Sequence, residues 1–142
     1  HPQVCAVMLG GADFSGELGV ALEWEPLLAA RQQMILACAE ARVPAIDAPY
    51  VALDDDEGFA EDCRRAKAIG FAAKSAIHPR QVPIAETVFE PTDALYEEAV
   101  DAVKAYEHAG EKAIRYKGRM LEAPLMKNYR AIIARKQGNG HA

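Results

Sequence analysis

Three short apolar runs that recur along the first half of the sequence most constrain how the chain can fold. They cover residues 4–9 (VCAVML), 44–50 (PAIDAPY) and 71–77 (FAAKSAI). The first is continuously apolar and stops at a Gly-Gly pair, which is typical of a strand buried on both faces. The strand ends are separated by roughly 30 to 40 residues, the length of a helix and its crossover. This rhythm predicts α/β architecture with parallel strands.

Helical periodicity fills the intervals and continues beyond the third run. Residues 26–42 place apolar side chains on one side, with Arg31 among the polar residues opposite. Residues 57–70 form a second predicted helix that ends at a glycine. The remainder is predicted to be helical, over 93–108 and 124–136. The predicted inward residues are Leu27, Met34, Ile35, Cys38, Ala41, Phe59, Cys63, Ala66, Leu95, Ala99, Ala102, Val103, Tyr106, Leu125, Tyr129, Ile132 and Ile133.

Charge and hydropathy limit the partners of the chain. Its 142 residues hold 16 Lys and Arg against 21 Asp and Glu, so no basic stripe is available to neutralise phosphates, and we expect no nucleic-acid partner. No apolar stretch approaches the roughly 18 residues of a membrane helix, and no basic-then-apolar leader opens the sequence. We therefore expect a cytoplasmic protein with no membrane contact. Cys5, Cys38 and Cys63 are odd in number and widely spaced, which favours reduced core thiols over a disulfide or metal site.

Polar residues follow each predicted strand, where parallel α/β folds carry their sites. After the first strand, GGAD (10–13) sets Asp13 behind two glycines, a position from which a carboxylate can ligate Mg²⁺. The alternative is an Asx turn or helix cap. One carboxylate is also fewer than a complete magnesium site needs, since one or two are usual with waters and substrate oxygens.

The two later loops carry further candidates. The acidic run at 54–58 is interpreted as a solvated loop whose last acids favour the next helix N-terminus. His78 precedes a proline, which favours extended backbone, and its ring either faces a cleft or is a hydrogen-bonded structural group. Lys74 at a strand end requires an anion or a carboxylate partner. Three parallel strands would also leave two open edges, so we expect an incomplete unit.

Four segments resemble one known family. "VMLGGADFSGELG", "PAIDAPYVALDDDEGF", "AKAIGFAAKSAIHPRQV" and "GRMLEAPLMKNYRAII", in this order, resemble the C-terminal half of the HpcH/HpaI aldolase and citrate lyase β-subunit family, in its CitE-like branch. The resemblance implies a TIM barrel, of which this chain would hold about strands six to eight. Residues 1–90 would then be a partial barrel domain, and residues 91–142 a C-terminal helical extension.

The resemblance also implies roles for individual residues. Asp13 matches the magnesium-binding aspartate of the family, while the partner glutamate and an arginine belong to earlier strands. Lys74, His78 and Gln81 match a motif that forms part of the wall accommodating CoA. Asp47 and Tyr50 match site-lining positions on the preceding loop.

Two departures from the family pattern concern Glu122 and Ala73. Glu122 stands where many relatives carry the aspartate that reaches a neighbouring subunit's site as an acid/base group. Its alternative role is a helix N-terminal acid. Ala73 replaces the glycine more usual before the lysine, and its methyl group would narrow the space beside a bound thioester.

The activity implied by the resemblance is Mg²⁺-dependent carbon–carbon cleavage of a hydroxyacyl-CoA such as malyl-CoA, citramalyl-CoA or a citryl thioester. The partners implied are the CoA thioester, an oxo acid and further copies of the chain in a homo-trimer or hexamer. Two alternatives are a thioesterase of a malyl-CoA-like substrate and a noncatalytic barrel-derived subunit. The 142 residues alone are expected to be inactive, because the second metal carboxylate and the arginine are missing.

Overall fold

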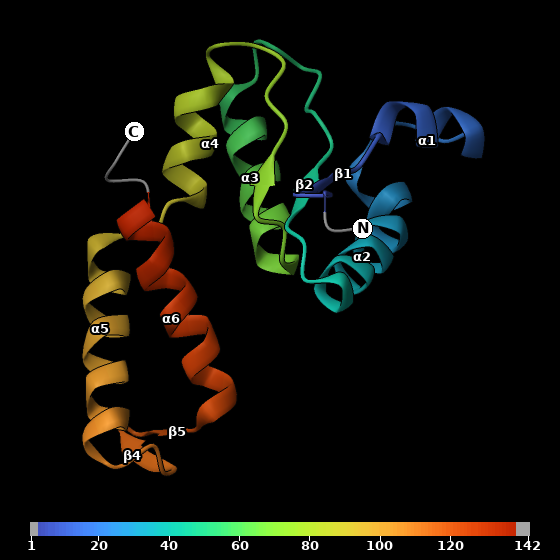
Figure 1. The fold of residues 1–142 in the computed structure, drawn as a ribbon. Helices are drawn as coiled ribbons and strands as arrows, with labels where there is room; N and C mark the ends of the chain where they lie inside the picture. Colours follow the sequence, from blue (N-terminus) through green and yellow to red (C-terminus); the bar gives the residue numbers. More distant parts are fainter. Residues whose placement is uncertain (1–2, 139–142) are drawn as a thin grey trace. The chain divides into compact units, whose positions relative to one another are not determined.

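The computed structural model describes residues 3–138, which fall into two compact units (Figure 1). The first unit ends at Phe89 and the second begins at Glu90. The first contains a parallel sheet with helices, and the second contains two helices joined by a hairpin. Each unit is described by itself below.

The first unit has the α/β architecture that the sequence predicts. Its sheet contains β1 (Val7–Met8), β2 (Ala45–Asp47) and β3 (Ala73–Lys74), in that order and all parallel. The pairing places Met8 opposite Ile46, Ile46 opposite Ala73, and Asp47 opposite Lys74. Its described helices are α1 (Gly11–Leu18), α2 (Trp24–Ala41), α3 (Asp56–Ile69) and α4 (Gln81–Phe89).

The alternation of side chains in β2 separates the two faces of the sheet. Ala45 lies in the apolar core with helix residues, so Asp47, two positions later, lies on the same helix-covered face. Ile46 lies on the opposite face, which the register shares with Met8 and Ala73. The core of the unit contains Trp24, Cys38, Ala45, Phe59, Cys63, Ala66, Phe71 and Phe89.

The first predicted strand is wrong in its burial. Val7 and Met8 are 37% and 56% exposed, although their apolar run predicts burial on both faces. In the described part of the chain β1 pairs with β2 alone, so it is an edge strand. All three strands are also shorter than their apolar runs. Each neighbouring pair of strands is joined in register at only two residue pairs.

Helix α3 forms as predicted, whereas α2 begins two residues earlier than predicted and differs at Arg31 and at Ala41, which is exposed although it is predicted to be inward. The side chain of Asp55 caps α3 by accepting from Gly58 N at 2.9 Å, and Gly70 ends the helix with φ of 111°. Arg31 is buried at 3% exposure, although it is predicted on the polar side of α2. It lies seven residues after Trp24 and therefore on the inward face. Helix α4 is not predicted by the sequence patterns, and α1 corresponds to the helix that the sequence leaves open as an alternative at Asp13.

The second unit combines one predicted helix pair with an unpredicted hairpin. Helix α5 (Asp93–His108) begins with Thr92 Oγ1 accepting from Leu95 N at 3.2 Å, and α6 spans Ala123–Gly138. Between them β4 (Ile114–Tyr116) and β5 (Arg119–Leu121) are antiparallel, so the all-helical expectation is wrong here. Positive φ angles at Lys117 and Gly118 close the two-residue turn.

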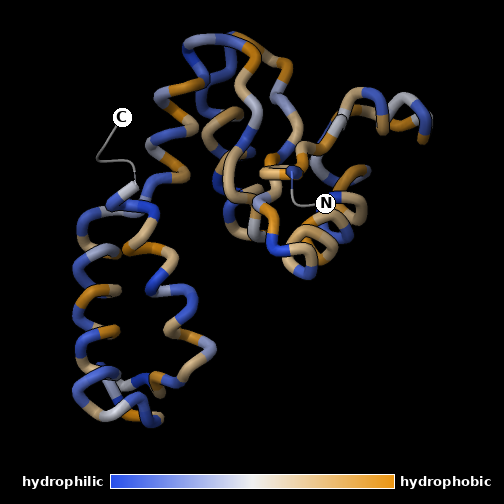
Figure 2. Tube along the Cα trace, viewed as in Figure 1, coloured by the Kyte–Doolittle hydropathy of each residue, from blue (hydrophilic) through white to orange (hydrophobic). Residues whose placement is uncertain are grey.

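The core of the second unit lies between α5, α6 and the hairpin. Figure 2 shows hydrophobic residues on the side of α5 that faces α6. Met126 is the inward residue at the start of α6, while Leu125, predicted to be inward, is 40% exposed. The buried cluster contains Ala102, Val103, Tyr106, Leu121 and Met126.

The three cysteines are all free thiols in the structure. Cys38 and Cys63 are buried, as predicted, and Cys5 is exposed and so is not a core thiol. Within residues 3–138, no helix combines the length and the apolar character needed to cross a membrane.

Candidate functional site

The carboxyl ends of β1, β2 and β3 meet at one edge of the parallel sheet. The loop after β1 leads directly into α1, and Asp13 lies in the first turn of that helix with its side chain exposed. No hydrogen bond or ion pair engages the Asp13 carboxylate within the described residues. The two longer loops are named here the β2 loop (residues 48–55) and the β3 loop (residues 75–80).

Gly11 fixes the approach of α1 to the end of β2. A Cβ atom added at Gly11 would lie 2.6 Å from the Ala48 Cβ, closer than packed carbon atoms lie. The glycine therefore allows the beginning of α1 to rest against the first residue of the β2 loop. This contact places the helix turn carrying Asp13 beside the carboxyl end of β2.

Four charged side chains lie beneath this edge, on the helix-covered face of the sheet, and three of them, Arg31, Asp47 and Lys74, are buried. Asp47 accepts from Arg31 Nε at Oδ1 and from Lys74 Nζ at Oδ2, both at 2.8 Å. Lys74 Nζ also donates to the Ala48 carbonyl at 2.8 Å and pairs with Asp62. The side chains of Asp47 and Lys74 are 0% exposed. The group contains two carboxylates and two cations, so its net charge is zero. Such pairing offsets the desolvation cost of burying charged groups.

This ion group decides between the partners expected for Lys74. The sequence requires either a bound anion or a carboxylate, and the structure supplies Asp47 and Asp62. Lys74 also lies on the helix-covered face rather than on the opposite one, because it pairs in register with Asp47. The thioester contacts expected for Lys74 and Asp47 stay predictions.

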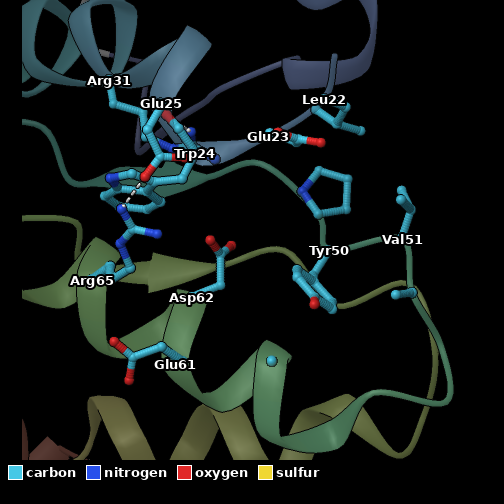
Figure 3. Close-up of a pocket in the computed structure, with 13 residues that line it drawn as sticks. Leu22, Glu23, Trp24, Glu25, Arg31, Tyr50, Val51, Glu61, Asp62 and Arg65 are labelled. Carbon is cyan, nitrogen blue, oxygen red and sulfur yellow. Dashed lines mark hydrogen bonds and ion pairs between the residues drawn. The ribbon is translucent and has the colours of Figure 1, made fainter.

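Trp24, the single tryptophan of the chain, lies between two guanidinium groups. The Cζ atoms of Arg31 and Arg65 are 4.4 and 4.5 Å from the ring centre. Arg65 in turn donates to Glu25 Oε1 at 2.7 Å, and this hydrogen bond lowers the pKa of that carboxyl (Figure 3). The arrangement joins the start of α2 to the middle of α3.

A surface pocket of about 400 Å³ opens next to this stack. Figure 3 shows Tyr50 and Val51 on one side of it, Trp24 and Arg65 on the other, and Asp62 between them. The sequence patterns do not single out Trp24, Arg31 or Arg65. The seven-residue spacing of Trp24 and Arg31 is the signal that predicts a shared inward face. The lining residues are Leu22, Glu23, Trp24, Glu25, Arg31, Pro49, Tyr50, Val51, Ala52, Gly58, Glu61, Asp62 and Arg65.

Tyr50 is held inside the β2 loop by Asp55. Its hydroxyl donates to Asp55 Oδ2 at 2.6 Å, and this hydrogen bond raises the pKa of Tyr50 to about 12 and lowers that of Asp55. The other oxygen of Asp55 caps α3 through Gly58 N. A side chain at Gly58 would collide with both Tyr50 and Asp55, so the glycine leaves room for the pair. The interpretation of the acidic run as a loop favouring the helix N-terminus is confirmed.

Gln81 links the β2 and β3 loops. Its Nε2 donates to the Tyr50 carbonyl at 2.9 Å, and its Oε1 accepts from Ile77 N at 2.9 Å. The side chain is 2% exposed. His78 is half-buried, and its Nδ1 accepts from Arg80 N at 3.3 Å. The two loops therefore lie side by side, with Tyr50 on one and His78 on the other.

Glu122 belongs to the second unit. It is exposed and directly precedes α6, where its carbonyl accepts from Leu125 N and Met126 N. That position corresponds to the helix N-terminal role left open by the sequence. The acid/base role expected across subunits stays a prediction.

Metal-binding side chains do not gather in the described residues. No group of three or more His, Cys, Asp or Glu there has the arrangement to hold an ion. Among the described residues Asp13 is thus a single exposed donor, and its metal role stays a prediction.

The fold and the strand-end loops define an α/β protein whose polar residues lie at the carboxyl edge of a parallel sheet. The chain belongs to the HpcH/HpaI aldolase/citrate lyase family, whose model matches residues 1–79. This match confirms the family resemblance carried by the sequence motifs.

Two curated relatives and one solved structure illustrate the similarity. Mitochondrial citramalyl-CoA lyase of Mus musculus is 32% identical over 133 residues, covering 90% of this chain and 39% of the relative. L-malyl-CoA/β-methylmalyl-CoA lyase of Cereibacter sphaeroides is 32% identical, covering 93% of this chain and 48% of the relative. The citrate lyase β subunit of M. tuberculosis, complexed with oxaloacetate and magnesium, is 28% identical with a TM-score of 0.53, covering 59% and 41%. This chain therefore spans less than half the length of these proteins.

Proposed function

We propose that this chain is part of a Mg²⁺-dependent lyase that cleaves a carbon–carbon bond in a hydroxyacyl-CoA. Family membership and the names of the citramalyl-CoA and malyl-CoA lyase relatives support this reaction class. Malyl-CoA, citramalyl-CoA and a citryl thioester are the candidate substrates. In this proposal residues 1–90 supply about strands six to eight of a TIM barrel, and residues 91–142 form its helical extension.

The observation that carries the proposal is the free carboxylate of Asp13 at the end of β1. It is exposed, lies in the first turn of α1 and has no protein partner in the described residues. Such an oxygen donor suits Mg²⁺, which is bound through one or two carboxylates with water and substrate completing its shell. Asp13 would supply one ligand, and donors outside this chain would supply the rest. The bound ion would make the carbonyl of the oxo-acid half a better electrophile.

Residues on the neighbouring loops would bind the thioester. Tyr50 and His78 lie on loops that Gln81 joins, and both side chains are partly accessible. Asp47 and Lys74 stay in the proposed binding region, beneath these loops. Glu122 would reach the site of a neighbouring copy as the acid/base group within a trimer or hexamer.

The metal role is tested by Asp13→Ala in a longer protein that contains this chain and the remainder of the family domain. We expect loss of Mg²⁺-dependent cleavage by at least about 100-fold, the scale of losing an essential electrostatic stabiliser. Asp54→Ala is the matched control, because Asp54 is also an exposed acid on a loop that follows a strand and has only a 3.7 Å surface pair with Arg80. Wild-type turnover and magnesium dependence in Asp13→Ala would overturn the assignment.

The products of the same assay separate the candidate reactions. Acyl-CoA plus an oxo acid indicates the lyase, whereas free CoA plus the hydroxy acid indicates a thioesterase. A longer protein that binds magnesium but turns over none of the three thioesters indicates a noncatalytic subunit.

The role of Glu122 is tested by mixing two inactive variants of the longer protein. Asp13→Ala and Glu122→Gln subunits should restore activity on mixing if the acid is supplied by a neighbouring copy. Unmixed Glu122→Gln with full activity would assign this residue to the helix N-terminus alone.

A further inference from the structure

Gln81 occupies an unusual position between the β2 and β3 loops. It is the first residue of α4, and its side chain is 2% exposed. A glutamine amide has one carbonyl oxygen and one amino group, and here each end is used by a different loop. The oxygen accepts from Ile77 N and the amino group donates to the Tyr50 carbonyl, both at 2.9 Å.

The buried ion group ties the same two loops at their bases. Lys74 Nζ, from the end of β3, donates to the carbonyl of Ala48, which opens the β2 loop, at 2.8 Å. Ser75 N, which opens the β3 loop, donates to the carbonyl of Asp47 at 3.1 Å. The loops are therefore joined at the strand ends by Lys74 and further out by Gln81.

We propose that Gln81 is a positioning residue, which sets the separation of Tyr50 and His78 without contacting the ligand itself. Both ends of its amide are already bonded to backbone groups, and at 2% exposure the side chain presents almost no surface to a ligand. This inference rests on the proposed function only in naming those loops as the binding region. It replaces the direct CoA contact expected for Gln81 with an action through the two loops.

Two substitutions separate the two hydrogen bonds. Gln81→Glu keeps an oxygen acceptor for Ile77 N but removes the donor to the Tyr50 carbonyl. Gln81→Met keeps a similar length and removes both bonds. Gln33→Glu is the matched control, because Gln33 is exposed and lies on α2, outside both loops.

Amide hydrogen exchange in the 142-residue chain tests the two hydrogen bonds of Gln81 without any substrate, through the exchange rates of amides in the β2 and β3 loops. In Gln81→Met, the Ile77 amide should exchange about tenfold faster, the scale of one lost hydrogen bond. In Gln81→Glu it should stay protected, while the Asp55 amide, which donates to Ala52 within the β2 loop, exchanges faster. Unchanged exchange at Ile77 in Gln81→Met would overturn the proposal. Circular dichroism establishes that each variant is folded, and Gln81→Glu retains the test if Gln81→Met unfolds.

Kinetics of the longer protein then distinguish positioning from ligand contact. Positioning predicts that both variants raise KM for the thioester several-fold, with Gln81→Met the more affected because it frees both loops. A direct contact predicts altered KM with wild-type exchange in both loops, which would contradict the proposal. If exchange changes as expected and the parent longer protein has no lyase activity, the proposed function fails while the positioning role of Gln81 stands.

Discussion

The two units of the molecule keep charge in opposite places. The first unit buries Arg31, Asp47 and Lys74 beneath the strand ends, with Asp62 close to the surface. The second unit has an apolar buried cluster, and its ion pairs, such as Arg130 with Glu107 and Glu111, are exposed. The buried residues between its helix pair and its hairpin are apolar or aromatic. The buried charges of the first unit lie at the bases of the β2 and β3 loops, which they hold at a fixed separation.

The largest effect should come from breaking the buried charge balance with Lys74→Met. Asp47 and Asp62 would then share Arg31 as the remaining cation of the group, and an uncompensated buried carboxylate is expensive. We expect unfolding free energy to fall by about 3–5 kcal/mol, measured by urea titration with Trp24 fluorescence. Lys127→Met, at an exposed lysine of α6, is the control. A loss below about 1 kcal/mol would show that the charges are not coupled.

Leu121→Ala tests whether the second unit depends on apolar packing alone. Leu121 is 1% exposed, so its truncation leaves a cavity between the hairpin and the helices. We expect a loss of about 2–4 kcal/mol in urea unfolding followed by far-ultraviolet circular dichroism. Leu125→Ala, at a position 40% exposed, should cost much less. Equal losses in the two variants would contradict the assigned core.

A smaller, pH-dependent effect should separate Tyr50 from the other tyrosines. Its hydrogen bond to Asp55 raises the Tyr50 pKa from 10.0 to about 12. The neutral phenol is the stabilised form, so this contribution to stability is complete below pH 10 and is lost as the pH rises through about 12. Ultraviolet absorbance should show a late tyrosinate step that Tyr50→Phe removes. A late step that persists in Tyr50→Phe would assign it to another residue.

The smallest effect is expected from Arg130→Ala, at the exposed ion pairs of the second unit. The guanidinium lies 3.3 and 3.4 Å from Glu107 and Glu111, and all three side chains are at least half exposed. Such pairs contribute about 0.5 kcal/mol, and salt weakens them. Urea unfolding at low and high ionic strength measures this. If Arg130→Ala lowered the free energy of unfolding as much as Lys74→Met, the exposed ion pairs would matter as much as the buried ones, and the contrast between the two units would be wrong.

Local signals in the sequence predict much of this fold. Helix α5 follows from the Thr92 cap, its inward stripe and the glycine beyond it, and α3 follows from its inward residues and Gly70. The hairpin is missed because its main signal is one Lys117-Gly118 turn between short strands. Helix α1 is predicted only as an alternative, because Gly10 and Gly11 indicate a turn, whereas Gly11 is required by the close approach to Ala48.

The candidate site is harder to predict, because its central contacts join distant residues. Arg31 is assigned to a polar face from its charge, but its partner Asp47 is 16 residues away and belongs to a strand. The Asp47–Lys74 pair depends on the register of β2 and β3, which the sequence patterns leave undetermined. By contrast, the position of Asp13 depends on local sequence, because it follows β1 by a few residues and lies in the first turn of α1, while its metal role stays a prediction.

The open side of β1 has a practical consequence for anyone handling this polypeptide. Within the described residues, one side of β1 has no neighbouring strand, and such an unpaired edge can pair with an extended segment of a second molecule. Recovery of monomer should therefore decline as the polypeptide becomes more concentrated during expression. A short strand fused ahead of β1 should pair with this open edge and reduce self-association of the polypeptide.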